Sequence, residues 1–389
     1  MDYSKILNPK VVELAPSGIR KYFDIAANMK DVISLGVGEP DFPTPWHIRQ
    51  SGIEAIQSKK TRYTSNWGLI ELRNEVADYM KRRFSLEYSG KSEVIISVGG
   101  SEAIDGAIRA IVGRGDEVII PQPSFVCYDP ITRLAGGVPV SLETKEENEF
   151  RITAEELRAA ITDKTKLLIL PYPCNPTGGI MEKEHLEEIA QVLRGTDIMV
   201  LSDEIYAELT YGKKHVSIAM LDGMWERTII IGGFSKTYSM TGWRLGYACG
   251  PEPIISQMVK IHQYAIMSAP TVSQYAAIEA LQNGDDDIQK MLSQYDMRRR
   301  IMVDGFNKLG LTCFEPRGAF YAFPCIRSSG LSSDEFCEKL LYSHRVALVP
   351  GNAFGACGEG FVRASYCYSV DHIKTALERI RDFLKELKA

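Results

Sequence analysis

The sequence lacks any apolar run that approaches the roughly 18 residues of a membrane-spanning helix. Its first residues, MDYSKILNPKVVEL, lack the basic start, apolar stretch and small-residue cleavage site of a secretory signal. Positive charge is not in excess, because the formal net charge is −5. These absences argue against a membrane protein, an exported protein and a general nucleic-acid binder. We therefore expect a cytoplasmic protein.

Paired cysteine motifs are also missing. The eight cysteines form no CxxC pair and lie mostly inside apolar segments, which is typical of reduced core thiols. We expect neither a metal site nor a catalytic cysteine. The chain contains no internal repeat, no low-complexity tract and no Gly/Ser-rich or Pro-rich linker. With 389 residues, it fits one large α/β unit and a smaller one.

Short apolar runs alternate with helical patterns between about residues 90 and 250. Continuous apolarity, rather than alternation, is typical of parallel strands buried on both faces. The helices are expected at Ser101–Val112, Thr153–Ile161 and Lys183–Leu193, the second opening with a capping box formed by Thr153 and Glu156. The predicted strands are Val94–Val98, Glu117–Pro121, Lys166–Pro171, Ile198–Ser202, Thr228–Gly232 and Leu245–Cys249. This pattern predicts an α/β fold with a mostly parallel central sheet in a large domain, residues 45–284.

The pattern changes after about Asn283. A charged amphipathic stretch, Asp285–Leu309, precedes two strand-like runs, Ala319–Pro324 and Phe361–Cys367, and a closing helix, Val370–Lys388. We expect these to form a smaller α+β domain from residues 285–389, with residues 1–44 packed against it.

Ligands of open α/β sheets bind outside the carboxyl ends of the strands, so the residues after each run are informative. Gly99-Gly100-Ser101-Glu102 opens a helix and could hold an anion, although a serine there is often only an N-cap. Asn175-Pro176-Thr177-Gly178 reads as a tight turn. Asp203 ends a strand, where a carboxylate is often only a cap or a solvated residue.

Lys236 is the most informative residue. It stands in GGFSKTYSMTGWRLG, directly after a buried-type strand and eight positions before Arg244. Desolvation beside another cation lowers the pKa of a lysine and makes its amine nucleophilic. These are the requirements of a Schiff-base lysine.

The chain resembles the class I/II aminotransferases of pyridoxal 5'-phosphate (PLP) fold type I, in particular the branch of aspartate and N-acetyl-L,L-diaminopimelate aminotransferases. The SK-x7-RLG stretch matches the family's cofactor-lysine motif. Further motifs follow in the family's order across nearly the whole chain: SLGVGEPDFPTP (34–45), YTSNWGLIELR (63–73), GGSEAI (99–104), NPTG (175–178), SDEIY (202–206), GAFYAFP (318–324) and VRASY (362–366).

The resemblance implies a role for each matching residue. Lys236 would hold PLP as a Schiff base and carry the proton of the reaction, and Asp203 would face the pyridine nitrogen and favour its protonation. The remaining cofactor contacts would come from Asn175 and Tyr206 at the phenolate oxygen, Phe125 on the ring, and Ser101, Glu102, Ser235 and Arg244 at the phosphate.

The resemblance also implies a homodimer with shared sites, because Tyr63 would reach the phosphate of the neighbouring subunit. Arg363 would bind the substrate carboxylate together with the Gly38 backbone, beside Phe125 and Asn175. From its residue type alone, Arg363 would be read as a solvent-facing strand residue. Arg20 or Lys21 could bind a side-chain carboxylate of the substrate.

The expected function is a PLP-dependent transaminase that moves an amino group from an L-amino acid, aspartate- or glutamate-like or related, to a 2-oxo acid such as 2-oxoglutarate. A β C–S lyase on the same fold shares the key residues and stays open as the alternative. A PLP-sensing transcription regulator would need a DNA-binding module, for which the resemblance, starting within the first forty residues, leaves no room.

Overall fold

The largest sheet of the protein has seven strands in the order β2-β8-β7-β6-β5-β3-β4. The computed structural model describes residues 1–16, 18 and 29–388. β8 is antiparallel to both its neighbours, and the remaining pairs are parallel. The strands are β2 Val94–Ser97, β3 Glu117–Gln122, β4 Val138–Glu143, β5 Thr165–Leu170, β6 Met199–Asp203, β7 Thr228–Gly233 and β8 Gly246–Cys249. The predicted mostly parallel sheet is confirmed, and β4 is an edge strand that the apolar pattern missed.

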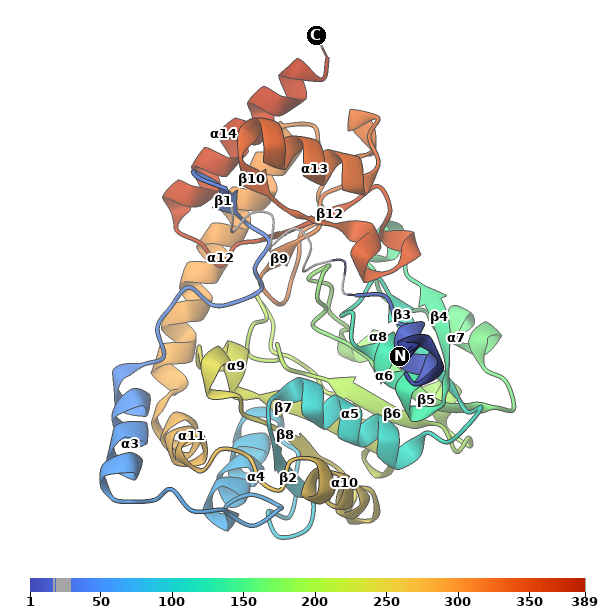
Figure 1. Ribbon diagram of the computed structural model, residues 1–389, viewed down its shortest axis with the longest axis vertical. Coiled ribbons are helices and arrows are strands. Elements are labelled where there is room, and N and C mark those ends of the chain that lie inside the picture. Colours follow the sequence, from blue (N-terminus) through green and yellow to red (C-terminus); the bar gives the residue numbers. More distant parts are fainter. Residues whose placement is uncertain (17, 19–28, 389) are drawn as a thin grey trace.

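Helices cover both faces of this sheet (Figure 1). Apolar side chains of α5, α6 and α10 pack on one face, and those of α4, α7, α8 and α11 pack on the other. The helices of this region are α3 Trp46–Gln57, α4 Ile70–Phe84, α5 Gly100–Ile111, α6 Tyr128–Ala135, α7 Ala154–Ala160, α8 Lys183–Leu193, α9 Phe234–Thr237, α10 Glu252–Ala265 and α11 Thr271–Asn283. The capping box of Thr153 and Glu156 is present at the start of α7.

A second, smaller region lies above the seven-stranded sheet in Figure 1, and the long helix α12 leads from α11 into it. Its antiparallel sheet has the order β11-β12-β9, and β1 pairs with β10 in parallel. The elements are β1 Ile33–Ser34, α12 Asp285–Lys308, β9 Tyr321–Ala322, α13 Ser333–His344, β10 Val346–Ala347, β11 Val349–Pro350, β12 Val362–Ser365 and α14 Val370–Glu386. The region has its own apolar core, to which α12, α13 and α14 contribute.

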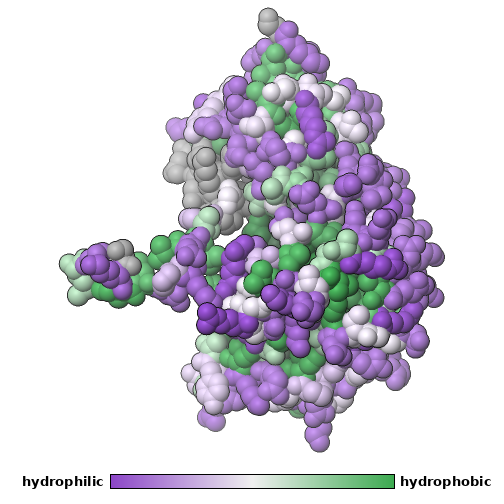
Figure 2. Space-filling view, turned by 90° about the vertical axis from the view of Figure 1, so that its right-hand side faces the viewer, coloured by the Kyte–Doolittle hydropathy of each residue, from purple (hydrophilic) through white to green (hydrophobic). Residues whose placement is uncertain are grey.

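The N-terminal residues do not all join this second region. Ile33 pairs with β10 and Leu35 packs in the apolar core of this region. The helix α1 (Pro9–Val12) instead contacts α6 of the large sheet region. The N-terminal segment projects from the body at the left of Figure 2 and carries exposed apolar side chains: Ile6, Leu7, Val11 and Val12.

Candidate active site

A cavity of about 300 Å³ lies where the carboxyl ends of the large sheet's strands face β9 and β12. Residues far apart in the sequence meet there because parallel strands end at the same edge of the sheet. Ten of the twelve residues predicted for the site line the cavity: Gly38, Ser101, Phe125, Asn175, Asp203, Tyr206, Ser235, Lys236, Arg244 and Arg363.

Lys236 lies in the short helix α9, which follows β7 directly. Its Nζ donates a hydrogen bond of 2.6 Å to the carbonyl oxygen of Gly38. Burial lowers the pKa of the Lys236 ammonium to about 8. A substantial fraction of this amine is therefore neutral near pH 8, which is the form that attacks an aldehyde.

Asp203 is the last residue of β6 and is buried. Its Oδ2 accepts a hydrogen bond of 2.6 Å from the hydroxyl of Tyr128, and its Oδ1 accepts one of 3.2 Å from the Ile205 amide. Burial raises the pKa of the Asp203 carboxyl to about 6, although both hydrogen bonds oppose the rise. The two donors thus favour the ionised form that a pyridinium partner requires.

Sequence reasoning missed Tyr128, which lines the cavity and is buried. It begins α6, three residues after Phe125, and the two rings meet edge to face at 6.0 Å. Phe125 lies just before the helix and was predicted for the site, so closeness in the sequence was the available signal for Tyr128. The pattern alone could not reveal that the hydroxyl reaches Asp203.

Arg363 lies on β12, is buried and lines the cavity. Its Nη1 donates to Asn175 Oδ1 at 2.8 Å and its Nη2 donates to the Gly36 carbonyl at 2.5 Å. Burial lowers the pKa of this guanidinium. Within the described residues its buried Nε has no hydrogen-bond partner. A buried cation with an unused donor is suited to a carboxylate ligand.

The start of α5 forms a site suited to an anion. Ser101 lies in its first turn, and Arg244 reaches the preceding loop, donating to the Val98 carbonyl at 3.5 Å. Gly99 has a φ of +85°, and a Cβ there would lie 2.6 Å from the Arg244 Nη2. Glycine therefore permits the arginine to approach the helix N-terminus, where backbone amides favour negative charge.

Two of the predicted cofactor residues do not line the cavity. The Glu102 side chain turns away from it, because its Oε2 accepts from the Val98 amide and its Oε1 pairs with His262 at 3.2 Å. Only the Glu102 backbone amide is left for the predicted phosphate contact. Tyr63 is 82% exposed, on the connection between α3 and α4. Arg20 and Lys21 lie outside the described residues.

A family model, "Aminotransferase class I and II", matches residues 30–380. The chain belongs to this family. It is 47% identical to an aspartate aminotransferase of Pyrococcus abyssi, over 96% of this chain and 97% of the relative. It is 43% identical to aromatic-amino-acid aminotransferase 2 of Thermococcus litoralis, over 98% of this chain and 99% of the relative. The structure of Thermus thermophilus aspartate aminotransferase with maleate has a TM-score of 0.93 and 36% identity, covering 97% of this chain and 99% of that one.

The aminotransferase is therefore PLP-dependent, with fold type I, and moves amino groups between amino acids and 2-oxo acids. The family match does not favour the β C–S lyase alternative. The cavity fits the cofactor's charges: an anion site at the start of α5, a buried carboxylate for a pyridinium, and a lysine whose lowered pKa suits Schiff-base formation. No helix among the described residues is long and apolar enough to cross a membrane.

Proposed function

We propose that Lys236 is the residue that holds PLP and carries the proton of the transamination. The observation that supports this assignment is that the Lys236 amine, the Asp203 carboxylate and the guanidinium of Arg363 share one cavity. Bound PLP supplies an electron sink for the carbanion formed at the substrate's α-carbon. Around it, Lys236 donates and accepts the proton, while Asp203 pairs with the pyridine nitrogen.

The other proposed contacts are supported by the side chains that line the cavity. Ser101, Ser235 and Arg244, which line the cavity near the start of α5, would hold the phosphate, and Phe125 would contact the ring. Asn175 and Tyr206 would donate hydrogen bonds to the phenolate oxygen, and Asn175 Oδ1 can accept from Arg363 at the same time. A single amide thus links the cofactor site to the carboxylate site.

Arg363 binds the α-carboxylate of the substrate, and Gly38 lies beside it in the cavity. Aspartate and glutamate are the proposed donors and 2-oxoglutarate the proposed acceptor, which the relatives named aspartate aminotransferases support. Arg20 or Lys21 would bind the side-chain carboxylate of these substrates. If Arg20→Ala leaves kcat/KM for aspartate and glutamate unchanged, that role for Arg20 is wrong.

We also propose a homodimer in which Tyr63 enters the partner's site. Several large apolar side chains are exposed near Tyr63, among them Tyr264, 87% exposed, and Met267, 47% exposed. Asn66 donates to the Met267 carbonyl at 2.7 Å, so the loop of Tyr63 and the end of α10 form one surface. Burial of this surface against a second copy would remove the apolar area from water.

The proposed location is the cytoplasm, which the eight free cysteine thiols support. The proposed large domain is residues 45–284, and residues 1–44 and 285–389 form the small one. The separate apolar core around α12, α13 and α14 supports this division, although α1 contacts the large region.

The experiment that tests the function is a single half-reaction. PLP-loaded protein is mixed with one amino acid at a time, without an acceptor, and the cofactor absorbance and the products are followed. Transamination predicts loss of the cofactor band with one 2-oxo acid formed per site, and the amino acids that react identify the donor. If none reacts, yet cystathionine releases pyruvate and ammonia, the enzyme is a lyase.

A further inference from the structure

Tyr321 belongs to the GAFYAFP motif (318–324), to which the proposed function assigns no role. It begins β9, is 1% exposed and lines the cavity. It does not follow a strand of the large sheet, so the expectation that site residues follow those strands did not include it. Its side chain lies between the cofactor residues and the substrate residues.

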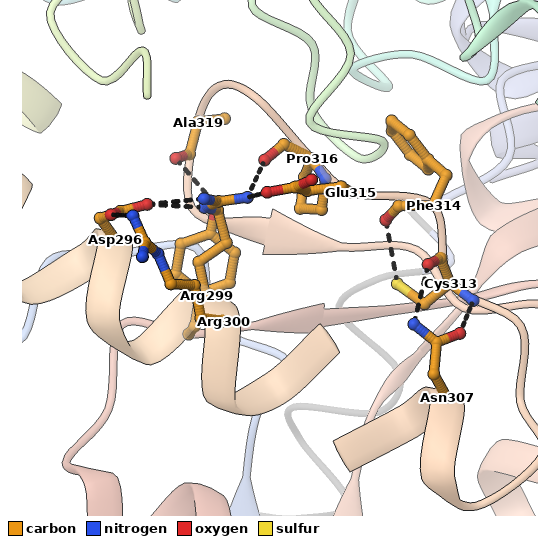
Figure 3. Close-up of polar contacts among 10 residues, drawn as sticks. Asp296, Arg299, Arg300, Asn307, Cys313, Phe314, Glu315, Pro316 and Ala319 are labelled. Atoms are coloured by element: carbon orange, nitrogen blue, oxygen red, sulfur yellow. Dashed lines mark hydrogen bonds and ion pairs between the residues drawn. The ribbon is translucent and has the colours of Figure 1, made fainter. Parts of the chain in front are cut away.

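The segment that carries Tyr321 is firmly held. Arg299, on α12, reaches the loop before β9, donating to Glu315 at 2.6 Å and to the Pro316 carbonyl at 3.1 Å (Figure 3). The amide of Gly318 donates to the Gly178 carbonyl at 2.9 Å. Tyr321 itself pairs with Ser365 of β12. This anchoring fixes the position of the Tyr321 ring.

The phenol of Tyr321 makes two contacts that matter for chemistry. Its oxygen lies 2.9 Å from the hydroxyl oxygen of Tyr206. Its ring centroid lies 4.5 Å from the Arg363 guanidinium carbon. A Cβ at position 38 would lie 2.1 Å from the Tyr321 oxygen, so Gly38 leaves the space that this hydroxyl occupies.

Either hydroxyl of the pair can be the donor, and acidity favours Tyr321. Burial raises the pKa of Tyr321 to about 12, and the cation of Arg363 limits the rise. Burial raises the pKa of Tyr206 well above its ordinary value, and the Tyr321 phenol beside it raises it further. Each phenol has one proton, and in the proposed function the proton of Tyr206 is donated to the phenolate oxygen of PLP. The Tyr206 oxygen then accepts from Tyr321, which is the more acidic phenol and so the better donor.

We propose that Tyr321 is a positioning residue that orients the Tyr206 hydroxyl toward the phenolate oxygen of PLP and strengthens that hydrogen bond. The proposal rests on the proposed contact between Tyr206 and PLP. A hydroxyl that accepts a hydrogen bond becomes a stronger donor, by an amount on the order of 10–30%. Stronger donation withdraws negative charge from the phenolate. The phenolate then stabilises a proton on the attached Lys236 nitrogen less well, and the pKa of that nitrogen falls.

The test is a pH titration of the cofactor absorbance of PLP-loaded protein without substrate. Tyr321→Phe is expected to raise the midpoint by a few tenths of a pH unit, about 0.3, and Tyr206→Phe by more. Adding Tyr321→Phe to Tyr206→Phe should change nothing further, because Tyr321 acts through Tyr206. The matched control is Tyr79→Phe, which loses a buried bond of 2.7 Å to Glu208 outside the cavity and should leave the midpoint unchanged.

An unchanged or lower midpoint in Tyr321→Phe would overturn the proposal, as would an additional rise in the double variant. A merely structural role would lower the melting temperature without moving the midpoint. If Tyr321→Phe does not fold, Gly38→Ala displaces the same hydroxyl and should raise the midpoint, and no rise overturns the proposal. If wild-type protein forms no pH-dependent cofactor band, the assignment of Lys236 fails as well. A normal wild-type titration with no variant effect rejects Tyr321 alone.

Discussion

In the cavity, the proposed cofactor residues lie at or next to the ends of strands of the large sheet, whereas the proposed carboxylate-binding residues lie on the loop after β1 and on β12, outside that sheet. We call the proposed cofactor residues Ser101, Asp203, Ser235, Lys236 and Arg244 the cofactor end, and the proposed carboxylate-binding residues Gly38 and Arg363 the substrate end; Asn175, Tyr206 and Tyr321 connect the two. The first set is arranged by the parallel strands and their loops. The second depends on how β9 and β12 lie over the large sheet.

The two ends also differ in how their charges are handled. At the cofactor end, burial shifts the pKa of Asp203 to about 6 and that of Lys236 to about 8, toward the neutral form of each. At the substrate end Arg363 stays a cation held by two hydrogen bonds. We infer that the first end moves protons and the second end positions a carboxylate, and substitutions should separate these tasks.

The largest effect is expected for Lys236→Ala, which removes the amine at the cofactor end. Loss of both the attachment point and the proton carrier should reduce transaminase activity by about 10⁴-fold or more. Added methylamine or ethylamine should restore part of the activity, since the cavity and its other residues remain. Activity within tenfold of wild type would show that another residue carries the proton.

Arg363→Lys should have the next largest effect and should act at the substrate end alone. Lysine cannot reproduce the planar pair of charge-assisted hydrogen bonds, so kcat/KM should fall on the order of 100-fold. Equilibrium dialysis should find an unchanged affinity for PLP. A parallel loss of PLP affinity would contradict the division of tasks between the two ends.

Tyr128→Phe removes the bond of 2.6 Å to Asp203 at the cofactor end. The pKa of Asp203 should rise further, its ionised form should be less populated, and kcat should fall on the order of 10- to 30-fold. Tyr172→Phe is the matched control, because it loses a buried bond of 2.8 Å to the Phe150 carbonyl away from the cavity. Equal kcat values for the two variants would exclude a role for Tyr128 in catalysis.

The smallest expected effect is the pH dependence of PLP uptake, which is measured on wild-type protein. Because the pKa of Lys236 is lowered to about 8, its neutral fraction rises as pH rises through that value. The rate at which apoprotein takes up PLP should therefore increase about tenfold between pH 7 and pH 9 and then level off. Stopped-flow absorbance measures this rate. A rate still rising steeply above pH 10 would indicate an ordinary, solvated lysine.

The parts of the large sheet that could be predicted from the sequence are those that local residue patterns determine. Apolar runs located six strands of the large sheet, and the strand-end rule pointed to Asp203 and Lys236. The strand β4 was missed because its pattern contains Pro139 and most of its residues are not fully buried. Arg363 was assigned by family resemblance alone, since its residue type suggested a surface position.

The direction in which individual side chains point could not be predicted from the sequence. Ser101 and Glu102 are neighbours, yet Ser101 lines the cavity while the Glu102 carboxylate turns to His262. Tyr128 and Tyr321 stand in segments that the sequence marked, but their hydroxyl partners, Asp203 and Tyr206, depend on tertiary packing. Sequence spacing does not report such contacts across the fold.

The attachment of PLP to Lys236 is tested most directly by borohydride reduction of the loaded protein, followed by tryptic peptide mapping. Reduction makes the bond to the cofactor permanent and blocks cleavage at the modified lysine. The label should appear on one peptide, Thr228–Arg244, uncut at Lys236. A label on any other lysine, or no label on wild-type protein, would contradict the assignment of the cofactor site.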